Sequence, residues 1–190
     1  MFLEGAELHD RIAAGGGTRI GEIGFGVGLN FCAALTALQA ASSATLEYIA
    51  FERCPPSAQE IERALSPWPE LAAARDALLA CWPPKDGAAV KIGDKAALTL
   101  HVGEALDRID RLDAACDVWW LDGFSPAKNP DAWDQALLAK IFERIAPGGR
   151  LSTYAAAGWV RRGLAAAGFT VERAPGFGAK REMLKARRPL

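Results

Sequence analysis

The sequence is poor in the residues that hold metals and disulfides. It has two histidines, His9 and His101, and four cysteines that stand far apart without a CxxC spacing. A zinc site needs ligands in close pairs, and disulfides need an oxidising compartment, so we expect neither a metal site nor disulfides. Four thiols among 190 residues instead fit a reducing compartment, where cysteine fills core positions.

An export signal, a membrane span and an excess of charge of one sign are also lacking. The first residues, MFLEGAELHD, show no basic start followed by an apolar block. The uncharged stretch 23–46 is interrupted by glycine, serine, asparagine and glutamine, so it is too polar for a membrane span. Lysine plus arginine (22) almost balances aspartate plus glutamate (23), for a net charge of −1. We therefore expect a cytoplasmic protein without a membrane partner, and not a bulk nucleic-acid coat protein.

Strand-like and helix-like segments alternate along a chain of ordinary globular composition, with 51% hydrophobic and 24% charged residues. Pro55 and Pro56 are expected in the first turn of a helix, and residues 147–149 are expected to stop a later one. The alternation predicts an α/β fold with a mostly parallel sheet, helices on both faces and an antiparallel pair of strands at the carboxyl-terminal edge. Strands are expected over residues 19–24, 46–52, 89–92, 97–102, 117–122, 150–154, 169–173 and 181–185, and helices over 29–41, 71–80, 132–145 and 160–167.

A glycine-rich turn follows the first expected strand, in the segment Glu22-Ile-Gly24-Phe-Gly26-Val-Gly28-Leu-Asn30. Glycines at such a place let a ligand approach the backbone closely, although a tight turn that binds nothing is the alternative. A dinucleotide fingerprint requires a small residue at the position of Leu29, whereas the third glycine here is Gly28. The G-x-G-x-G form resembles the first motif of S-adenosylmethionine-dependent methyltransferases.

Carboxylates stand at the ends of three further expected strands. Glu52 ends the second one, where an acid can accept hydrogen bonds from both ribose hydroxyls of a nucleotide cofactor. Glu104 follows Gly103, in a position where many methyltransferases place an acid against the adenine amino group, and where a helix cap is the other reading. Asp122 precedes a loop rich in glycine and proline. Because ligands of such sheets bind at the carboxyl ends of the strands, these acids are candidates for one site.

Three segments carry a specific resemblance: LDGFSPAKNP at 121–130, VRRGL at 160–164 and GFGAKREML at 176–184. With them the chain resembles the methyltransferase domain of the MnmC/MnmD family, which makes 5-methylaminomethyl-2-thiouridine in bacterial tRNA. The resemblance implies a class I, Rossmann-like methyltransferase fold. It also implies S-adenosyl-L-methionine as the donor and the wobble uridine of tRNA as the acceptor.

The resemblance also implies roles for single residues. The turn from Gly24 to Gly28 would cradle the methionine part of the donor, Glu52 would bind its ribose and Glu104 its adenine. Asp122 would face the methyl group and the acceptor amine, and no histidine lies near it in the sequence to replace it as the catalytic residue. The full set expected to contact the donor is Glu22, Gly24, Phe25, Gly26, Gly28, Asn30, Glu52, Gly103, Glu104 and Asp122.

Positive charge gathers toward the carboxyl end. Residues 147–190 hold nine basic and two acidic side chains, a local net charge of +7 that leaves −8 for the rest of the chain. Such a region suits a local phosphate-binding face, although a solvated helix face and tail is the alternative. Trp133, like Phe124, is a candidate for stacking on anticodon bases. The residues expected to contact RNA are Phe124, Lys128, Asn129, Arg161, Arg162, Lys180 and Arg181.

We expect a single methyltransferase domain over residues 1–190. By the resemblance, it lacks the stretch that family members carry upstream of FLEG and the FAD-dependent oxidase domain of bifunctional members. The expected partners are the anticodon region of tRNA and a separate or attached oxidase. Three alternatives remain open: methylation of a small-molecule or protein amine, a nicotinamide-dependent oxidoreductase, and a non-catalytic module that binds the donor or RNA.

Overall fold

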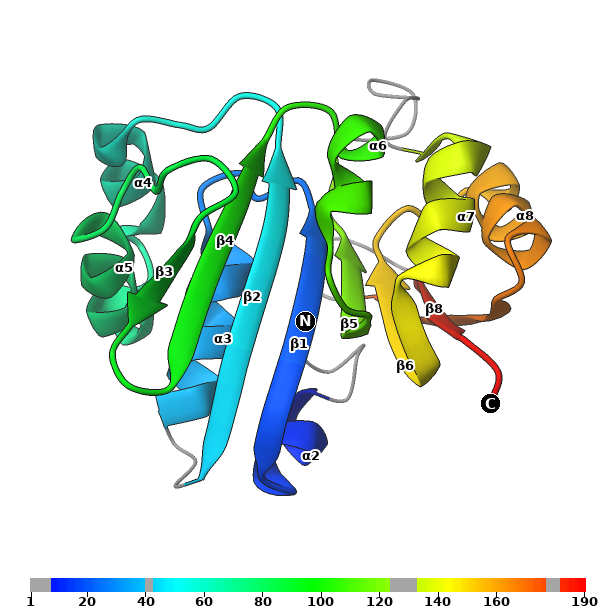
Figure 1. Ribbon diagram of the computed structural model, residues 1–190, viewed down its shortest axis with the longest axis horizontal. Coiled ribbons are helices and arrows are strands. Elements are labelled where there is room, and N and C mark those ends of the chain that lie inside the picture. Colours follow the sequence, from blue (N-terminus) through cyan, green and yellow to red (C-terminus); the bar gives the residue numbers. More distant parts are fainter. Residues whose placement is uncertain (1–7, 40–42, 124–132, 177–181) are drawn as a thin grey trace.

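The computed structural model describes residues 8–39, 43–123, 133–176 and 182–190, which are arranged around one eight-stranded sheet (Figure 1). The strands are β1 (Gly16–Ile23), β2 (Ala44–Glu52), β3 (Ala89–Ile92), β4 (Ala96–Val102), β5 (Cys116–Leu121), β6 (Ile145–Thr153), β7 (Thr170–Pro175) and β8 (Glu182–Arg187). They lie in the order β3-β4-β2-β1-β5-β6-β8-β7. The pairs β1–β2, β1–β5, β2–β4 and β5–β6 are parallel, whereas β8 is antiparallel to both β6 and β7. The expected α/β fold with a carboxyl-terminal antiparallel pair is confirmed.

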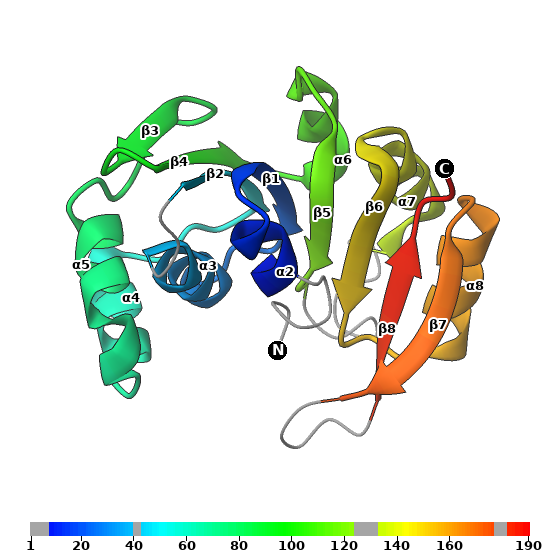
Figure 2. The same cartoon turned by 90° about the horizontal axis from the view of Figure 1, so that it is seen from below.

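Helices cover both faces of the sheet (Figure 2). They are α2 (Leu8–Ala13), α3 (Leu29–Gln39), α4 (Ala58–Leu65), α5 (Ala72–Leu79), α6 (Ala105–Arg108), α7 (Gln135–Glu143) and α8 (Gly158–Ala166), with short 3₁₀ turns at Pro69–Leu71 and Ile109–Arg111. One face packs against α2, α3, α4 and α5, and the other against α6, α7 and α8. No helix in the described part of the chain is both long and apolar enough to cross a membrane.

Two hydrophobic cores, one on each face, follow from the alternation of side chains along the strands. Trp119 and Trp120 are neighbours on β5 and therefore point to opposite faces, each with no exposed surface. Trp120 belongs to the core beneath α3, together with Tyr48 and Phe31. Trp119 belongs to the core beneath α6 and α7. The central strands are thus buried on both faces, as parallel strands between two helical layers must be.

Gly21 is required by this packing, because it lies beside Trp119 of the neighbouring strand. A Cβ atom at Gly21 would lie 2.8 Å from three atoms of the indole ring. We expect Gly21→Ala to lower the free energy of unfolding by about 1–3 kcal/mol through overpacking. The matched control is Gly17→Ala on the same strand, whose Cβ would meet the Thr45 hydroxyl at an ordinary 3.4 Å. Denaturant titration checks both variants, and equal stabilities would contradict this account.

Two of the expected boundaries are wrong. Pro55 and Pro56 do not lie in the first turn of α4, because Ser57 caps this helix in a reciprocal arrangement with Glu60 that satisfies two backbone N–H groups. Residues 147–149 do not stop α7 but lie inside β6, opposite an irregularity in the pairing with β5. Gly149 permits that irregularity, since a Cβ there would lie 3.0 Å from the carbonyl oxygen of Asp117.

Candidate functional site

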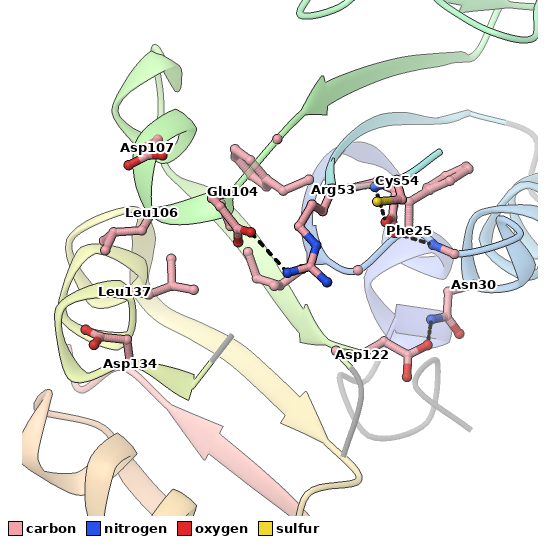
Figure 3. A pocket seen from close by; sticks show the side chains of 18 of the residues that line it. Phe25, Asn30, Arg53, Cys54, Glu104, Leu106, Asp107, Asp122, Asp134 and Leu137 are labelled. Carbon is pink, nitrogen blue, oxygen red and sulfur yellow. Dashed lines mark hydrogen bonds and ion pairs between the residues drawn. The ribbon is translucent and has the colours of Figure 1, made fainter. Parts of the chain in front are cut away.

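A cavity of about 690 Å³ opens at the carboxyl ends of the parallel strands. Its wall is built from the turn after β1, the end of β2, the start of α6, the residues after β5 and the start of α7. Figure 3 shows Asp122 and Asn30 at one end of this cavity and Asp134, Leu106 and Leu137 at the other. Segments far apart in the sequence thus meet at one edge, where the parallel arrangement places strand ends together.

The three glycines after β1 serve different purposes. Gly24, with φ +86°, passes the end of β5 so closely that a Cβ would lie 2.9 Å from the carbonyl oxygen of Asp122. Gly26, with φ +54°, faces open space, with no atom within 4 Å of the Cβ position. Gly28 does not line the cavity, and its Cβ would collide with Leu78 and Phe25 at 2.8–2.9 Å. Gly26 is therefore the glycine that leaves room for a ligand, and Gly28 is required by packing.

Glu52 is held rigidly by backbone groups. Its Oε2 accepts a hydrogen bond from the Gly26 amide at 2.9 Å, and its Oε1 accepts one from the Cys54 amide at 2.9 Å. Each carboxylate oxygen has a second lone pair for another donor. The carboxylate is consequently preorganised beside the open space at Gly26, as the ribose-binding prediction requires.

An arginine that the sequence reading missed lies between the acids of the cavity. Arg53 Nη1 contacts Glu104 Oε1 at 3.3 Å, and this pair is the one that Figure 3 shows spanning the cavity. Both side chains are about half exposed, 57% and 48%, so the pair is readily broken. Its position directly after Glu52, at the end of a strand, is the sequence feature that could have identified Arg53 as a site residue. Asp107 and Asp134, which also line the cavity, were missed too.

Asp122 belongs to a chain of hydrogen bonds that leads from the cavity into the core. Its Oδ2 accepts from Asn30 Nδ2 at 2.8 Å, and the same nitrogen donates to Glu22 Oε1 at 2.7 Å. Glu22 Oε2 in turn accepts from the Tyr48 hydroxyl at 2.7 Å. Asn30 lies in the first turn of α3, so the network joins β1, β2, α3 and the end of β5. Glu22 itself has no exposed surface and does not line the cavity.

Burial changes the acidity of both carboxyl groups. Desolvation raises the pKa of Asp122 to about 6, against the opposing effect of the hydrogen bond from Asn30. Desolvation also raises the pKa of Glu22 well above its usual range, against the opposing hydrogen bonds from Asn30 and Tyr48, and the neighbouring charges of Asp122 and Glu52 add to the rise. Asp122 is thus a carboxylate at neutral pH that can still take up a proton, a property common among catalytic acids and bases.

Of the remaining predicted residues, some line the cavity, one is buried in the core and others lie outside the described part of the chain. Phe25 and Gly103 line the cavity, and Phe25 is stacked on Trp82 with ring centroids 5.4 Å apart. Trp133 is 4% exposed and packs in the core beneath α7, so the expectation that it stacks on anticodon bases is wrong. The predicted RNA contacts Phe124, Lys128, Asn129, Lys180 and Arg181 lie outside the described residues.

The basic residues of the carboxyl-terminal third do not all face solvent. Arg188 donates to the backbone carbonyl oxygens of Phe142 and Ile145 and lies over the Phe142 ring, so it is a structural residue rather than part of a solvated tail. Arg173 pairs with Glu182. Arg161 and Arg162 are exposed on α8, and neither guanidinium has an ion pair or hydrogen bond within the described part of the chain.

The residues of the cavity fit S-adenosyl-L-methionine. Five acids line the cavity with one base, Arg53, which suits a donor that carries a positive sulfonium. The open space at Gly26 would be filled by any Cβ, which is the mark of a cradle for a ligand. Glu52 would take the ribose hydroxyls, and Glu104 the adenine amino group.

This fold, with its cavity at the strand ends, defines a class I S-adenosylmethionine-dependent methyltransferase. Residues 69–189 match the family described as S-adenosyl-L-methionine-dependent methyltransferase, and the chain belongs to that family. The expected methyl donor is therefore confirmed, and with it the enzyme class.

Curated relatives refine the family. Two of them are named tRNA 5-methylaminomethyl-2-thiouridine biosynthesis bifunctional protein MnmC, from Chromohalobacter salexigens (44% identical over 97% of this chain) and from Pseudomonas aeruginosa strain UCBPP-PA14 (45% over 97%). The chain spans only 27% and 29% of their lengths. The resemblance to the MnmC family is thereby confirmed.

Solved structures agree with this placement. The crystal structure of MNMC2 from Aquifex aeolicus is 27% identical and superposes with a TM-score of 0.76 over all of this chain and 60% of that one. The methyltransferase CalS10 from Micromonospora echinaspora, solved with S-adenosylmethionine bound, is 15% identical with a TM-score of 0.52, over 97% of this chain and 90% of that one. The second likeness concerns the fold alone.

Proposed function

We propose that this chain methylates the primary amine of 5-aminomethyl-2-thiouridine at the wobble position of tRNA, giving 5-methylaminomethyl-2-thiouridine. The observation that carries the proposal is Asp122, a carboxylate that is exposed at the cavity wall and held in place by Asn30. The names of the relatives supply the acceptor, because the geometry of one carboxylate suits any amine. The same names describe bifunctional proteins, which fits the FAD-dependent oxidase that the family resemblance implies as a second domain or partner.

The acceptor amine must lose a proton before it can react, since an ammonium group has no lone pair. Methylation replaces one N–H bond by an N–CH₃ bond and releases one proton. Asp122 accepts an N–H hydrogen bond from the amine, which orients the nitrogen and favours loss of its proton. The bound donor supplies an electrophilic methyl group on sulfur. Most of the rate enhancement then comes from alignment of two substrates by a rigid site.

An RNA-binding surface is available at the same edge of the sheet. Because β6 is parallel to β5, the segment after β6 leaves the sheet at the edge where Asp122 lies. There α8 begins, with Trp159 43% exposed and with Arg161 and Arg162 exposed beside it. Exposed tryptophan and arginine are the side chains that stack on bases and bind phosphates of single-stranded RNA loops. We include Trp159 and both arginines in the proposed tRNA-binding face.

Charge reversal tests this face. We expect Arg161→Glu/Arg162→Glu to weaken tRNA binding about tenfold or more and to reduce the slope of log Kd against log salt by about 1.5–2, because two phosphate contacts are lost. Arg63→Glu/Lys85→Glu is the matched control, with the same change of net charge on exposed positions elsewhere. Filter binding across a salt series measures both, and equal effects of the two double variants would contradict a local binding face.

The activity itself is tested by nucleoside mass spectrometry. Undermethylated tRNA is incubated with the chain and S-adenosylmethionine, and the wobble nucleosides are then separated. The proposal requires a gain of one methyl group on 5-aminomethyl-2-thiouridine. Methylation of free amines without dependence on tRNA would instead support a small-molecule methyltransferase.

We further propose that the chain forms one methyltransferase domain and works in the cytoplasm, where tRNA is modified.

A further inference from the structure

The structure contains a buried carboxyl group that the proposed reaction does not use. Glu22 is completely buried on β1, in the core beneath α3. Its carboxyl group is separated from that of Asp122 by a single side chain, Asn30. A buried ionisable group is costly unless it is neutral or paired, so its presence so close to the candidate catalytic residue calls for a physical account.

The Asn30 amide is held between the two carboxyl groups. Its Nδ2 atom has two hydrogens, and the structure directs one to Glu22 Oε1 at 2.7 Å and the other to Asp122 Oδ2 at 2.8 Å. Both donors are therefore used, and the plane of the amide is set by Glu22 on the buried side. If the amide turned over, its oxygen would face the Asp122 carboxylate and repel it. With the Glu22 proton on Oε2, directed at the Tyr48 oxygen, Oε1 can only accept a hydrogen bond and therefore fixes which atom of Asn30 meets Asp122.

The charges around Glu22 favour its protonated form. Tyr48 from β2, Asp122 from the end of β5 and Glu52 from the end of β2 are the titratable groups that face it, and no cation of the described residues is among them. Two carboxyl groups linked through one amide do not both ionise cheaply, so Glu22, which is fully buried, retains its proton and Asp122, which is exposed at the cavity, titrates. This division agrees with a pKa of Glu22 raised well above its usual range and a pKa of Asp122 of about 6.

We propose that Glu22 is a positioning residue for methyl transfer: its neutral carboxyl group retains the proton of the pair and fixes the Asn30 amide, which holds Asp122 ionised and aimed at the acceptor amine. The 2.7 Å contact with Tyr48 serves equally when Glu22 donates and the tyrosine oxygen accepts. The role of Glu22 in catalysis rests on the function proposed above, whereas its protonation state does not.

Two substitutions at Glu22 separate the positioning role from a merely structural one. Glutamine has the shape and hydrogen-bonding capacity of a protonated glutamate, so Glu22→Gln is expected to keep kcat within about threefold and to keep the acid limb of its pH profile. Leucine offers Asn30 no acceptor, so Glu22→Leu is expected to lower kcat at neutral pH about tenfold or more. Its acid limb should move to higher pH by about half a unit or more, because Asn30 no longer stabilises the Asp122 carboxylate.

The readouts are kcat against pH and the Kd for the donor. In Glu22→Leu we expect the donor Kd to change less than about threefold, because Glu22 does not line the cavity. The matched control is Ser152→Ala, another fully buried polar residue of the sheet, which is expected to leave the pH profile unchanged. A Glu22→Leu profile identical to that of Glu22→Gln would overturn the positioning role, as would an acid limb that moves to lower pH in Glu22→Gln.

Infrared difference spectroscopy tests the proton directly. We expect wild-type protein at about pH 8 to show the C=O band of a protonated carboxyl, absent from Glu22→Gln and shifted by ¹³C-glutamate. An ionised Glu22 at this pH would overturn the proposal, and this measurement decides it even if Glu22→Leu does not fold. The spectrum needs neither tRNA nor donor. A protonated Glu22 in a protein that fails to methylate tRNA would therefore refute the proposed function alone.

Discussion

Asp122→Asn is expected to lose methyl transfer while keeping both the fold and donor binding. The asparagine keeps the size of the side chain and its oxygen can still accept from Asn30, but the amide cannot take the charge or the proton-accepting role of a carboxylate. We expect kcat to fall about 10²–10⁴-fold, the usual range for a residue that assists proton transfer. Single-turnover methylation of tRNA measures this fall, and isothermal titration with the donor measures the retained binding.

The same substitution is expected to stabilise the protein at neutral pH. The pKa of Asp122 is raised in the folded state, from 3.8 to about 6, so the folded protein binds this proton more tightly than the unfolded chain. Its contribution to stability is therefore present at low pH, is lost as the pH rises between about 4 and 6, and does not return above that. An asparagine has no such loss, so the variant should gain about 0.5–1.5 kcal/mol above pH 6, less than the whole shift implies because solvent screens an exposed group, and little below pH 4.

Denaturant unfolding at low and neutral pH checks the sign of this effect. Asp94→Asn, at an exposed turn position, is the matched control and should change neither activity nor the pH dependence of stability. Near-normal methylation of tRNA by Asp122→Asn would exclude the catalytic role. A variant that is less stable than wild type at neutral pH would instead show that the Asp122 carboxylate, despite its raised pKa, stabilises the fold.

Glu52→Gln is expected to weaken donor binding with little effect on chemistry at saturating donor. The glutamate accepts two backbone N–H groups, and the glutamine has only one oxygen, so its NH₂ group would oppose either the Gly26 or the Cys54 amide. A hydrogen bond from a ribose hydroxyl of the donor to a charged carboxylate contributes about 1.5–3 kcal/mol. Its loss corresponds to an increase of about 10–100-fold in the donor Kd. The KM for the donor should rise accordingly, and kcat should stay within a fewfold of wild type.

Isothermal titration with S-adenosylmethionine measures this loss. Glu62→Gln on the exposed surface of α4 changes the net charge by the same amount and is the control. If both variants bind the donor like wild type, Glu52 does not contact the ribose. If Glu52→Gln reduces kcat as much as Asp122→Asn, the division between donor binding and catalysis is wrong.

Much of the fold could be predicted from local sequence. The alternation of short apolar strands with amphipathic segments predicts a parallel sheet between helices, because each strand must be buried on both faces. Residues 147–149 were misread because local preference favours a turn there, whereas the chain pairs with β5 on both sides of them. Gly148 and Gly149 also exchange backbone hydrogen bonds with Arg188. Where local preference and sheet pairing disagree, the long-range hydrogen bonds prevail.

The candidate site, like the fold, could be predicted from the sequence only in part. Gly24, Gly26, Glu52, Glu104 and Asp122 were found because each lies at or just after the end of a strand, and parallel strands bring their carboxyl ends to one edge. Gly28 belongs to the same motif, but its role became clear only from its contact with Phe25 and Leu78. Spacing along the chain shows which residues a turn brings to the sheet edge, and it does not show what packs behind them.

The sequence by itself determined the class of the protein: the scarcity of histidine and paired cysteine, the G-x-G-x-G turn and the acids at strand ends lead to a donor-binding α/β fold. Only the tertiary structure decided that Trp133 is buried, that Arg53 lies against Glu104, and that Glu22 joins Asp122 through Asn30. The physical reason is that burial and hydrogen bonding are set by residues from distant segments. The pKa of a carboxyl group depends on those neighbours, and they are fixed only when β1, α3 and β5 pack together.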